Sequence, residues 1–354
     1  MRIAITADLH LATRAMAPQQ YLALEDILSQ MIEMRVDTIL FAGDIFDDSL
    51  RDYSDFDALC RDARYRHIHV HLIPGNHDLS LTRSAISADN VAVYPLPTVL
   101  RLGAEQRAFL LLPFETNKTM GERLADFAPT LSEEDWVLVG HGDYTRARQV
   151  RDGYESGVYM PLTARDVDLF RPSKVVLGHI HFPTDQEPVY YAGSPCGHDI
   201  TETGRRRFLV YDTETKVMQS FRVNAPVIYF DEAIMIVPDE KETDYLAATI
   251  RALIAAWGLS EAEASRARIR VKAKGYALDR RAIKQVLIDG FAGYRFYGDA
   301  EPDDSEVRLG DGGARASIAC AVKQKLPGLE WPQGGDEPTR EDVLWSALNL
   351  IYGG

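Results

Sequence analysis

The chain has 354 residues with 53 acidic and 39 basic side chains, and its formal net charge of −14 weighs against a polyanionic partner. This length predicts two domains, and because no apolar run approaches the ~18 residues of a membrane span and no signal peptide precedes the first strand, we expect a cytoplasmic protein without membrane contact. The three cysteines form no Cys-x-x-Cys pair, which excludes a thiolate metal site and suits a reducing compartment.

The first predicted strand ends in two residues of metal-binding type. It opens at Arg2, and Asp8 and His10 follow at its carboxyl end. Residues i and i+2 of an extended segment point to the same side, so this pair can bind one ion together. Behind it, the spacing of apolar residues predicts an amphipathic helix over 18–37.

Four later apolar runs end in the same manner. They lead into Gly43-Asp44-Ile45-Phe46-Asp47, Gly75-Asn76-His77-Asp78, Gly140-His141-Gly142 and Gly178-His179-Ile180-His181. In open α/β sheets, ligands gather outside the carboxyl ends of strands, and a glycine there lets an ion or a phosphate come close. Oxygen and imidazole donors together suit Mn, Fe or Zn, so we interpret the set as a two-metal centre.

The remaining elements up to residue 223 complete a mixed α/β domain. Period and turn signals predict helices over 54–66, 120–127 and 163–170, and strands over 91–94, 98–102, 108–112, 189–192, 207–211 and 217–223. His67, His69 and His71 alternate on one strand. We interpret them as structural, because that strand already ends in the Asn76-His77 motif and neighbouring residues of one strand rarely converge on one ion.

The composition shifts after a hinge at 224–226. A small α/β domain is predicted over 224–298, with helices over 246–259 and 280–289 and strands over 266–274 and 293–298. Residues 299–338 are rich in Asp, Gly and Pro and are predicted to be a linker. The capping box Thr339-Arg-Glu-Asp342 then begins a short helix that ends near Ile351.

Two segments concentrate positive charge in this acidic chain. On the strand at 266–274, strict alternation places five cations on one face, namely Arg266, Arg268, Arg270, Lys272 and Lys274. The loop at 142–161 carries Arg146, Arg148 and Arg151 among tyrosines. Both are candidate DNA contacts, since the placement of charge says more than the net value. The alternatives are a strand protected from edge pairing and a solvated loop.

In order and spacing, the five motifs resemble the signatures of the calcineurin-like metallophosphoesterases. Gly178-His179-Ile180-His181, followed by Tyr191-Ala192-Gly193-Ser194-Pro195 and by 208–211, is most similar to the SbcD family of bacterial DNA repair nuclease subunits. The resemblance covers residues 1–222. It implies a four-layer α/β/β/α fold, with two packed sheets flanked by helices, and a smaller C-terminal α/β capping domain.

The resemblance also implies roles for the motif residues. One metal takes Asp8, His10, Asp44 and His181, and the other takes Asp44, Asn76, His141 and His179, so that Asp44 bridges them. Mn²⁺ is the expected metal, with Mg²⁺, Fe²⁺ or Zn²⁺ as alternatives. His77 lies outside the metal set and suits a general acid. Asp47 and Asp78 are expected to orient imidazoles.

The function expected from this resemblance is a two-metal-dependent DNA nuclease, exo- or endonucleolytic, in DNA end processing or double-strand-break repair. A small-molecule phosphodiesterase or nucleotide pyrophosphatase is the alternative, because the centre does not reveal whether the phosphate belongs to a polymer. A phosphoprotein phosphatase ranks lower, since those enzymes read Gly-Asp-x-Val-Asp-Arg-Gly. A DNA-end binding scaffold without catalysis ranks last.

Relatives of the SbcD type also have protein partners. They dimerise through helices of the nuclease domain, here the segment 54–66 with its thin apolar face, and they bind an SbcC-like ABC/SMC-type ATPase through C-terminal helices. This chain departs from that pattern, because only one short helix follows the predicted linker. A stripe of Leu344, Leu348 and Ile351 is the candidate ATPase docking surface.

Overall fold

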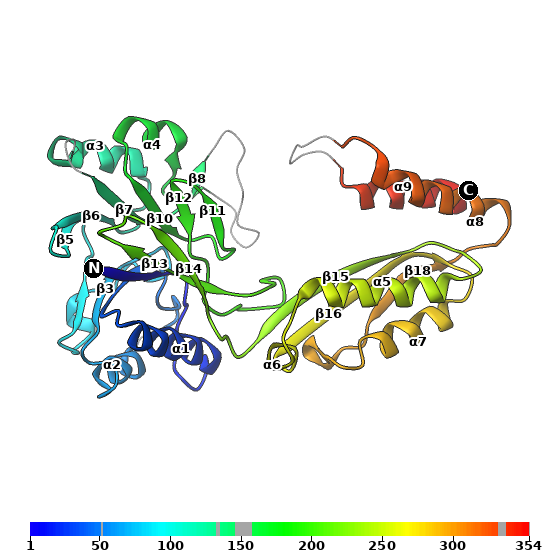
Figure 1. Cartoon of the computed structure of the whole chain (residues 1–354), viewed down its shortest axis with the longest axis horizontal. Coiled ribbons are helices and arrows are strands. Elements are labelled where there is room, and N and C mark those ends of the chain that lie inside the picture. Colours follow the sequence, from blue (N-terminus) through cyan, green and yellow to red (C-terminus); the bar gives the residue numbers. More distant parts are fainter. Residues whose placement is uncertain (51, 132–134, 146–157, 332–337, 354) are drawn as a thin grey trace. The chain divides into compact units, whose positions relative to one another are not determined.

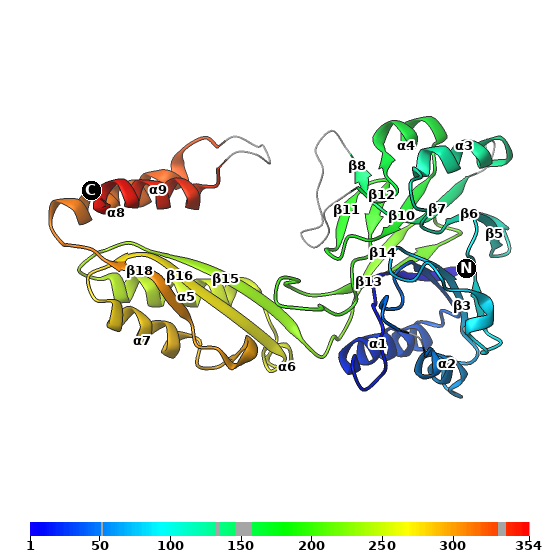
Figure 2. The same cartoon turned by 180° about the vertical axis from the view of Figure 1, so that it is seen from behind.

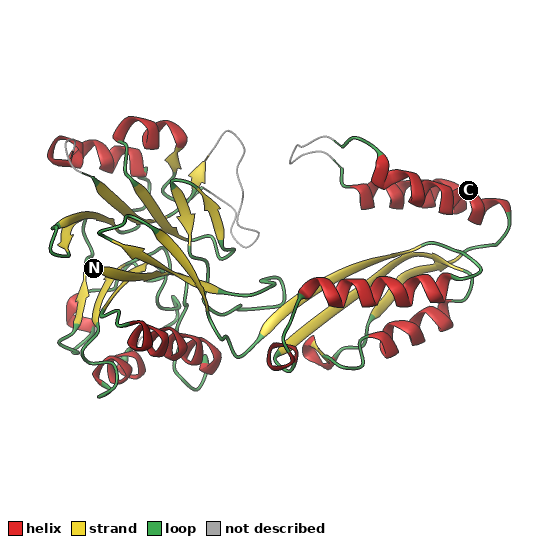
Figure 3. Ribbon diagram, in the orientation of Figure 1, coloured by secondary structure: helices red, strands yellow, loops and turns green. Residues whose placement is uncertain are grey.

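The computed structural model describes residues 1–50, 52–131, 135–145, 158–331 and 338–353. Their contacts divide the chain into two compact units. The N-terminal unit is Met1–His198 with Arg205–Pro226, and the C-terminal unit is Asp199–Gly204 with Val227–Gly354. Figure 3 shows helices and strands in both units. In the described part of the chain, no helix is long and apolar enough to cross a bilayer.

The first sheet of the N-terminal unit is parallel at its centre. Its order is β14-β13-β1-β2-β3-β4, in which β1 to β4 run parallel and β13 and β14 are antiparallel additions. The strands are β1 (Arg2–Thr6), β2 (Thr38–Ala42), β3 (His69–Ile73), β4 (Val91–Val93), β13 (Arg207–Asp212) and β14 (Met218–Arg222). The connecting helices are α1 (Pro18–Met34) and α2 (Ser54–Arg61).

The second sheet repeats this plan. Its order is β11-β12-β10-β7-β6-β5, with a parallel centre and antiparallel outer strands. The strands are β5 (Thr98–Leu102), β6 (Arg107–Leu112), β7 (Trp136–His141), β10 (Lys174–Gly178), β11 (Thr184–Gln186) and β12 (Val189–Tyr191). The associated elements are the helices α3 (Met120–Leu131) and α4 (Ala164–Phe170) and the small ribbon of β8 (Tyr144–Thr145) with β9 (Leu162–Thr163).

The predicted four-layer α/β/β/α fold is confirmed. Between the sheets lies an apolar cluster to which both contribute, with Ile5 and Leu40 from the first sheet and Leu111, Val139 and Val176 from the second. Helices α1 and α2 lie outside the first sheet, and α3 and α4 lie outside the second (Figures 1 and 2). Strands buried on both faces need near-continuous apolar runs, and β2 is buried at every position.

The C-terminal unit is built on a parallel sheet of its own, with helices on its apolar face. All its strands run parallel to the central β16 (Ala267–Ala277), and they are β15 (Ile228–Ile236), β17 (Arg295–Phe296) and β18 (Asp303–Leu309). Helices α5 (Glu242–Trp257) and α7 (Arg280–Gly290) pack on the apolar face of β16 around Ile250 and Leu287, and the short α6 (Glu261–Ala264) precedes β16.

The prediction of a linker over 299–338 is wrong in its local structure. These residues contain the edge strand β18, the helix α8 (Ala314–Lys325) and the 3-10 turn η3 (Leu326–Gly328). Another 3-10 turn, η2 (Tyr297–Asp299), lies at the start of the stretch. Contacts place the whole stretch from Val227 in one unit, and Thr203 also joins it through a bridge to Tyr229. Two helices, α8 and α9 (Arg340–Tyr352), therefore precede the C-terminus where one was expected.

Two apolar surfaces expected to be free are buried within their own units. Leu344 and Leu348 of α9 are 7% and 0% exposed, because they pack with α8 and with Tyr276 of β16. The proposed docking stripe is therefore wrong. On α2, which ends at Arg61 and not near Arg66, Phe56 and Leu59 are likewise buried and leave no free apolar face for a dimer.

Candidate metal centre

Side chains of metal-binding type from the five motifs meet at the carboxyl ends of β1, β2, β3, β7 and β10. Together with His198, they form three overlapping groups of donor atoms, each with all atoms within 4.8 Å of one another. The groups are Asp44 with His141 and His179, His10 with Asp44 and His77, and His10 with His181 and His198. The sharing of Asp44 and His10 shows that the three groups form one continuous centre.

Left-handed backbone aims these side chains. The φ angles are 56° at Asp8, 46° at His10 and 50° at Asp44, in a region that non-glycine residues seldom adopt and that costs of order 1–3 kcal/mol each. Backbone hydrogen bonds hold the first two loops together, since the Asp8 N–H donates to Gly43 O and the His10 N–H to Asp44 O, both at 3.1 Å. Strain of this kind is typical of functional sites.

Two motif glycines allow the loops to approach closely. A Cβ atom added at Gly43, whose φ is +90°, would lie 2.2 Å from Nδ1 of His141. One added at Gly75 would lie 2.1 Å from Oδ1 of Asp44. No side chain fits at either position without displacing a candidate ligand. Steric exclusion therefore explains why both positions are occupied by glycine.

On one side of the centre, two imidazoles and two oxygens face one another. Nε2 of His141 lies 3.2 Å from Oδ2 of Asp44 and 2.9 Å from Oδ1 of Asn76, which lies 3.2 Å from Nδ1 of His179. Nδ1 of His141 donates to Ala42 O at 2.9 Å, leaving Nε2 as the atom for an ion. Burial alone would lower the pKa of His141, but neighbouring Asp44 and Asp8 raise it to about 9.

On the other side, two imidazole nitrogens point at each other. Nε2 of His10 lies 3.2 Å from Nε2 of His181 and 3.8 Å from Oδ2 of Asp44. Two nitrogens bound to one ion at ~2.0–2.1 Å lie about 3 Å apart, which matches the first spacing. Burial lowers the pKa of His10 to about 3, so this imidazole is held in the neutral form that a metal requires.

The surroundings of the Asp8 carboxylate show whether the site fits a cation. Its carboxylate is fully buried, and Oδ1 accepts the N–H of His179 at 2.8 Å. Within the described residues, Oδ2 has no hydrogen-bond partner, and burial raises the pKa of this carboxyl to about 6. A buried acceptor without a partner is costly, and a divalent ion beside His10 would compensate it. The donor set therefore fits a pair of metal ions.

His77 lies beside this set. Its backbone N–H donates to Oδ1 of Asp44 at 2.9 Å, and its ring stands edge-on to His10 with centroids 4.8 Å apart. The side chain is half-buried. Its donor atom lies within 4.8 Å of those of His10 and Asp44, a place that suits a proton donor as well as a ligand.

Asp47 and Asp78 do not orient imidazoles, which corrects our expectation. Asp47 accepts the backbone N–H of Ser49 at 2.9 Å and its hydroxyl, and so closes its own turn. Asp78 is buried, and its carboxylate accepts three backbone N–H groups, those of Ile45 (2.9 Å), Phe46 (3.2 Å) and Gly75 (2.6 Å). Tight loops expose amide donors that need such an acceptor. Among the described residues, neither carboxylate forms a hydrogen bond with a histidine ring.

Sequence reasoning missed His198. This half-buried imidazole follows the Gly193-Ser194-Pro195 loop, and its ring centroid lies 5.0 Å from that of His10 and 5.2 Å from that of His181. No motif spacing singles it out, and only its position directly after a loop of the nuclease-like signature could have drawn attention to it. The three alternating histidines, by contrast, stay outside the centre in the described structure. His71 binds the Tyr94 hydroxyl through Nδ1 at 2.9 Å.

The candidate DNA contacts differ in what can be said of them. Arg146, Arg148 and Arg151 lie outside the described residues. Arg266 precedes β16, and its guanidinium donates to Ala262 O at 3.3 Å, so it does not belong to the cationic row. Along β16, buried positions alternate with Arg268, Arg270, Lys272 and Lys274, as predicted. The Arg270 guanidinium, however, forms a two-pronged ion pair with Asp231 of β15.

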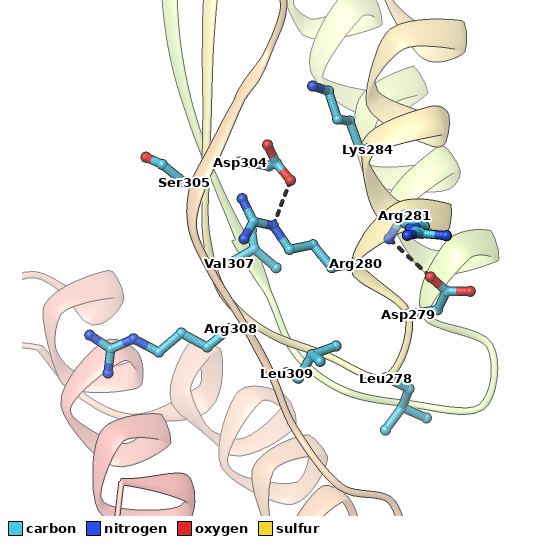
Figure 4. A pocket seen from close by; sticks show the side chains of 10 residues that line it. All are labelled: Leu278, Asp279, Arg280, Arg281, Lys284, Asp304, Ser305, Val307, Arg308 and Leu309. Carbon is cyan, nitrogen blue, oxygen red and sulfur yellow. Dashed lines mark hydrogen bonds and ion pairs between the residues drawn. The ribbon is translucent and has the colours of Figure 1, made fainter.

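A pocket of about 710 Å³ lies elsewhere in the C-terminal unit, between the start of α7 and β18. Figure 4 shows that its middle is spanned by the ion pair of Arg280 with Asp304, at 2.7 Å. The Arg308 guanidinium lies over the Trp345 ring, 5.8 Å from its centroid, and Lys284 is paired with Glu301 at 3.0 Å. The cations of the pocket therefore do not converge on a single point.

A comparison with protein families supports the resemblance of the N-terminal part to the calcineurin-like phosphoesterases. A sequence model of the calcineurin-like phosphoesterases matches residues 1–217. No curated protein matches the sequence significantly.

Distant similarities exist among solved structures. An archaeal phosphodiesterase is 12% identical, with 63% of this chain and 100% of the other covered and a TM-score of 0.33. GAP50, the anchor in the inner membrane complex of Plasmodium, is 14% identical, with 64% and 89% covered and a TM-score of 0.40. A dimetal phosphatase from Danio rerio is 13% identical, with 63% and 96% covered and a TM-score of 0.40.

Proposed function

The chain belongs to the calcineurin-like phosphoesterase family, and from this premise we propose that it is a nuclease that hydrolyses phosphodiester bonds of DNA. Membership of the family makes it a metal-dependent phosphoester hydrolase with a dinuclear metal site. The proposal adds the substrate, a cytoplasmic location and a role in DNA end processing of the SbcD type. Its main support is the row of cations on the face of β16 that does not pack on α5 and α7, in a chain whose net charge is −14.

Each group of side chains has a role in the proposed reaction. When bound, two divalent ions ionise a water near neutral pH and neutralise charge on the phosphate oxygens. Asp8, His10 and His181 would hold one ion, Asn76, His141 and His179 would hold the other, and Asp44 would contribute to both. His77 donates a proton to the leaving alkoxide oxygen, because it lies at the edge of the centre.

We infer that Mn²⁺ is the native metal. The proposed set combines carboxylate and amide oxygens with four imidazoles, a mixture that suits Mn²⁺, Fe²⁺ or Zn²⁺. Mg²⁺ prefers oxygen ligands and keeps several waters, so it fits an imidazole-rich set less well.

A small phosphodiester is the second candidate substrate, and one observation favours it. The cationic row on β16 is partly neutralised, since Arg270 is paired with Asp231, and Asp303 and Glu306 of β18 lie beside Lys272 and Lys274 in the sheet register. A neutralised cation releases no counterion on binding duplex DNA and adds nothing to affinity. DNA remains the first proposal, because Arg268, Lys272 and Lys274 have no ion-pair partner within the described part of the chain.

The partners belong to the same proposal. With Leu344 and Leu348 buried, an SbcC-like ATPase would have to bind the outer surfaces of α8 and α9, where Ile318 and Leu350 are exposed. A homodimer would likewise need a surface other than the buried face of α2.

One assay series tests the substrate. Purified protein with Mn²⁺ is given linear duplex DNA, cyclic nucleotides and bis(4-nitrophenyl) phosphate, with an Asp44→Ala variant as the control for contaminating nucleases. We expect release of nucleotides from the duplex by the wild-type protein only. Hydrolysis of the small diesters without any cleavage of DNA would contradict the nuclease and favour the second candidate.

A further inference from the structure

His198 lies in the centre but outside the proposed ligand set. Its ring is in contact distance of two candidate ligands, edge-on to His10 and tilted against His181. One nitrogen from each of the three rings lies within 4.8 Å of the other two. Three half-buried imidazoles at this spacing are an arrangement that holds a metal ion in proteins.

The hydrogen-bond partners of His198 are compatible with a metal bond from one ring nitrogen. Nε2 lies 3.1 Å from the backbone oxygen of Asp8, and Nδ1 lies 3.4 Å from the side-chain amide of Gln20. The Asp8 carbonyl accepts a hydrogen bond from Nε2–H, and the amide oxygen of Gln20 can accept one from Nδ1–H, because the two ends of an amide are interchangeable in assignment. In either tautomer, one N–H is held by a neighbouring acceptor, which is the usual state of a histidine bound to a metal.

The ring of His141 shows a similar hydrogen-bond arrangement within the same centre. Its Nδ1 donates to the carbonyl of Ala42 at 2.9 Å, and this bond leaves Nε2 facing Asp44 and Asn76. His198 and the carbonyl of Asp8 repeat this relation on the other side.

We propose that His198 is an additional ligand of the metal ion held by Asp8, His10 and His181, an inference that rests on the proposed two-metal function. The third imidazole makes this side richer in nitrogen than the side of Asn76, His141 and His179. Imidazole favours Fe²⁺, Co²⁺ and Zn²⁺ over Mg²⁺. The two ions therefore bind unequally, and the nitrogen-rich side selects the softer metal.

The test measures Co²⁺ binding, because the visible absorption of this ion reports its ligands directly. Metal-free full-length protein is titrated with Co²⁺, and affinity and spectrum are recorded for wild type, His198→Ala and His198→Phe. His71→Ala is the matched control, since His71 is a half-buried imidazole of the same unit that binds Tyr94 and lies outside the centre. Thermal unfolding of the metal-free variants shows whether each one folds.

We expect wild type and His71→Ala to bind two Co²⁺ with the same spectrum. Both His198 variants should bind one of the two ions ~10–100-fold more weakly, the range of effects found for groups that tune a metal site, with a changed spectrum. Added imidazole should restore the spectrum of His198→Ala, where the ring is missing, and not that of His198→Phe, where the space is filled.

Two outcomes overturn the inference, and they can be told apart. If folded His198→Ala keeps the affinities and spectrum of the wild type, His198 is not a ligand, and the two-metal function stands. If the wild-type protein itself binds no Co²⁺, the proposed function fails and the inference fails with it.

Discussion

At the scale of single residues, the centre separates groups that bind from groups that position. Asp44 and His141 are buried members of the donor groups, and Asp8 is buried beside them, with Oδ1 4.0 Å from Nδ1 of His141. Asp78 is equally buried, but its oxygens are occupied by three backbone N–H groups from two different loops. The sequence places each of them in one of the five motifs. Only their contacts distinguish ligand from support.

The first prediction concerns His77 as a proton donor. His77→Ser leaves the backbone hydrogen bond to Asp44 in place, because that bond comes from the main chain. We expect two metals per chain and a fall in DNA cleavage of ~10²-fold or more, the usual size of general acid catalysis. Metal analysis and turnover measure this, with Asp44→Ala as the variant that loses metal. Loss of an ion from His77→Ser would instead make His77 a ligand.

The second prediction compares Asp78 with Asp47. Asp78→Ala leaves three buried N–H groups without an acceptor, and since each such group costs about 1–3 kcal/mol, we expect a loss of at least about 3 kcal/mol in the free energy of unfolding. Asp47→Ala, in a partly exposed turn, should cost about 0.5 kcal/mol. Urea unfolding of the metal-free proteins provides both values. Equal losses would mean that Asp78 is not the support of these loops.

At the scale of elements, β16 shows what alternation does and does not reveal. Its apolar face packs on α5 and α7, and its cations stand on the other face, as the sequence pattern predicts. The neighbouring strands then decide how much of that charge is available. Asp231 on β15 forms an ion pair with Arg270, whereas Arg268 lies next to Tyr229 and Arg295 in the register.

A third prediction follows for DNA binding by β16. Changing Arg268 and Lys272 to Gln should lower duplex affinity and reduce the slope of log affinity against log salt by ~0.9 for each phosphate that these cations neutralise. Arg270→Gln is the matched control on the same face, and it should change the slope little because its charge is already paired. Hydrolysis of bis(4-nitrophenyl) phosphate should stay unchanged in all variants. An unaltered slope in the double variant would show that the row does not contact DNA.

At the scale of the whole molecule, metal binding should stabilise the two units unequally. All candidate ligands belong to the N-terminal unit, and the C-terminal unit has an apolar core of its own. Unfolding of such a chain need not be a single transition. A ligand that binds only the folded state stabilises the unit that holds it.

The fourth prediction is therefore a selective effect of metal removal. At a free Mn²⁺ concentration about 100-fold above the dissociation constant, the N-terminal unit should gain about 2.7 kcal/mol, and EDTA should remove this gain. Calorimetry detects the shift, and hydrogen exchange followed by mass spectrometry locates it. Asp44→Ala should show no shift. Equal protection of β15 and β16 would contradict a centre confined to the N-terminal unit.

The sequence by itself determined the layered fold and the motif residues of the centre. Apolar runs of β1, β2, β3, β7 and β10 end in polar ligand-type residues, and this local signal needs no knowledge of distant contacts. Where the signal is absent, the prediction was wrong. The edge strand β18 reads DDSEVRL with a single buried residue, and α8 is rich in small side chains, so both looked like a linker.

Only the tertiary structure decided which side chains meet across long stretches of chain. His198 reaches the backbone of Asp8, Asp78 reaches the loop after β2, and Asp231 neutralises Arg270. The tertiary structure also buries Leu344 and Leu348 of α9, which the sequence predicted to be available for docking. The physical reason is that periodicity reports which face of an element is apolar, while partners are set by sheet order and packing, which periodicity does not contain.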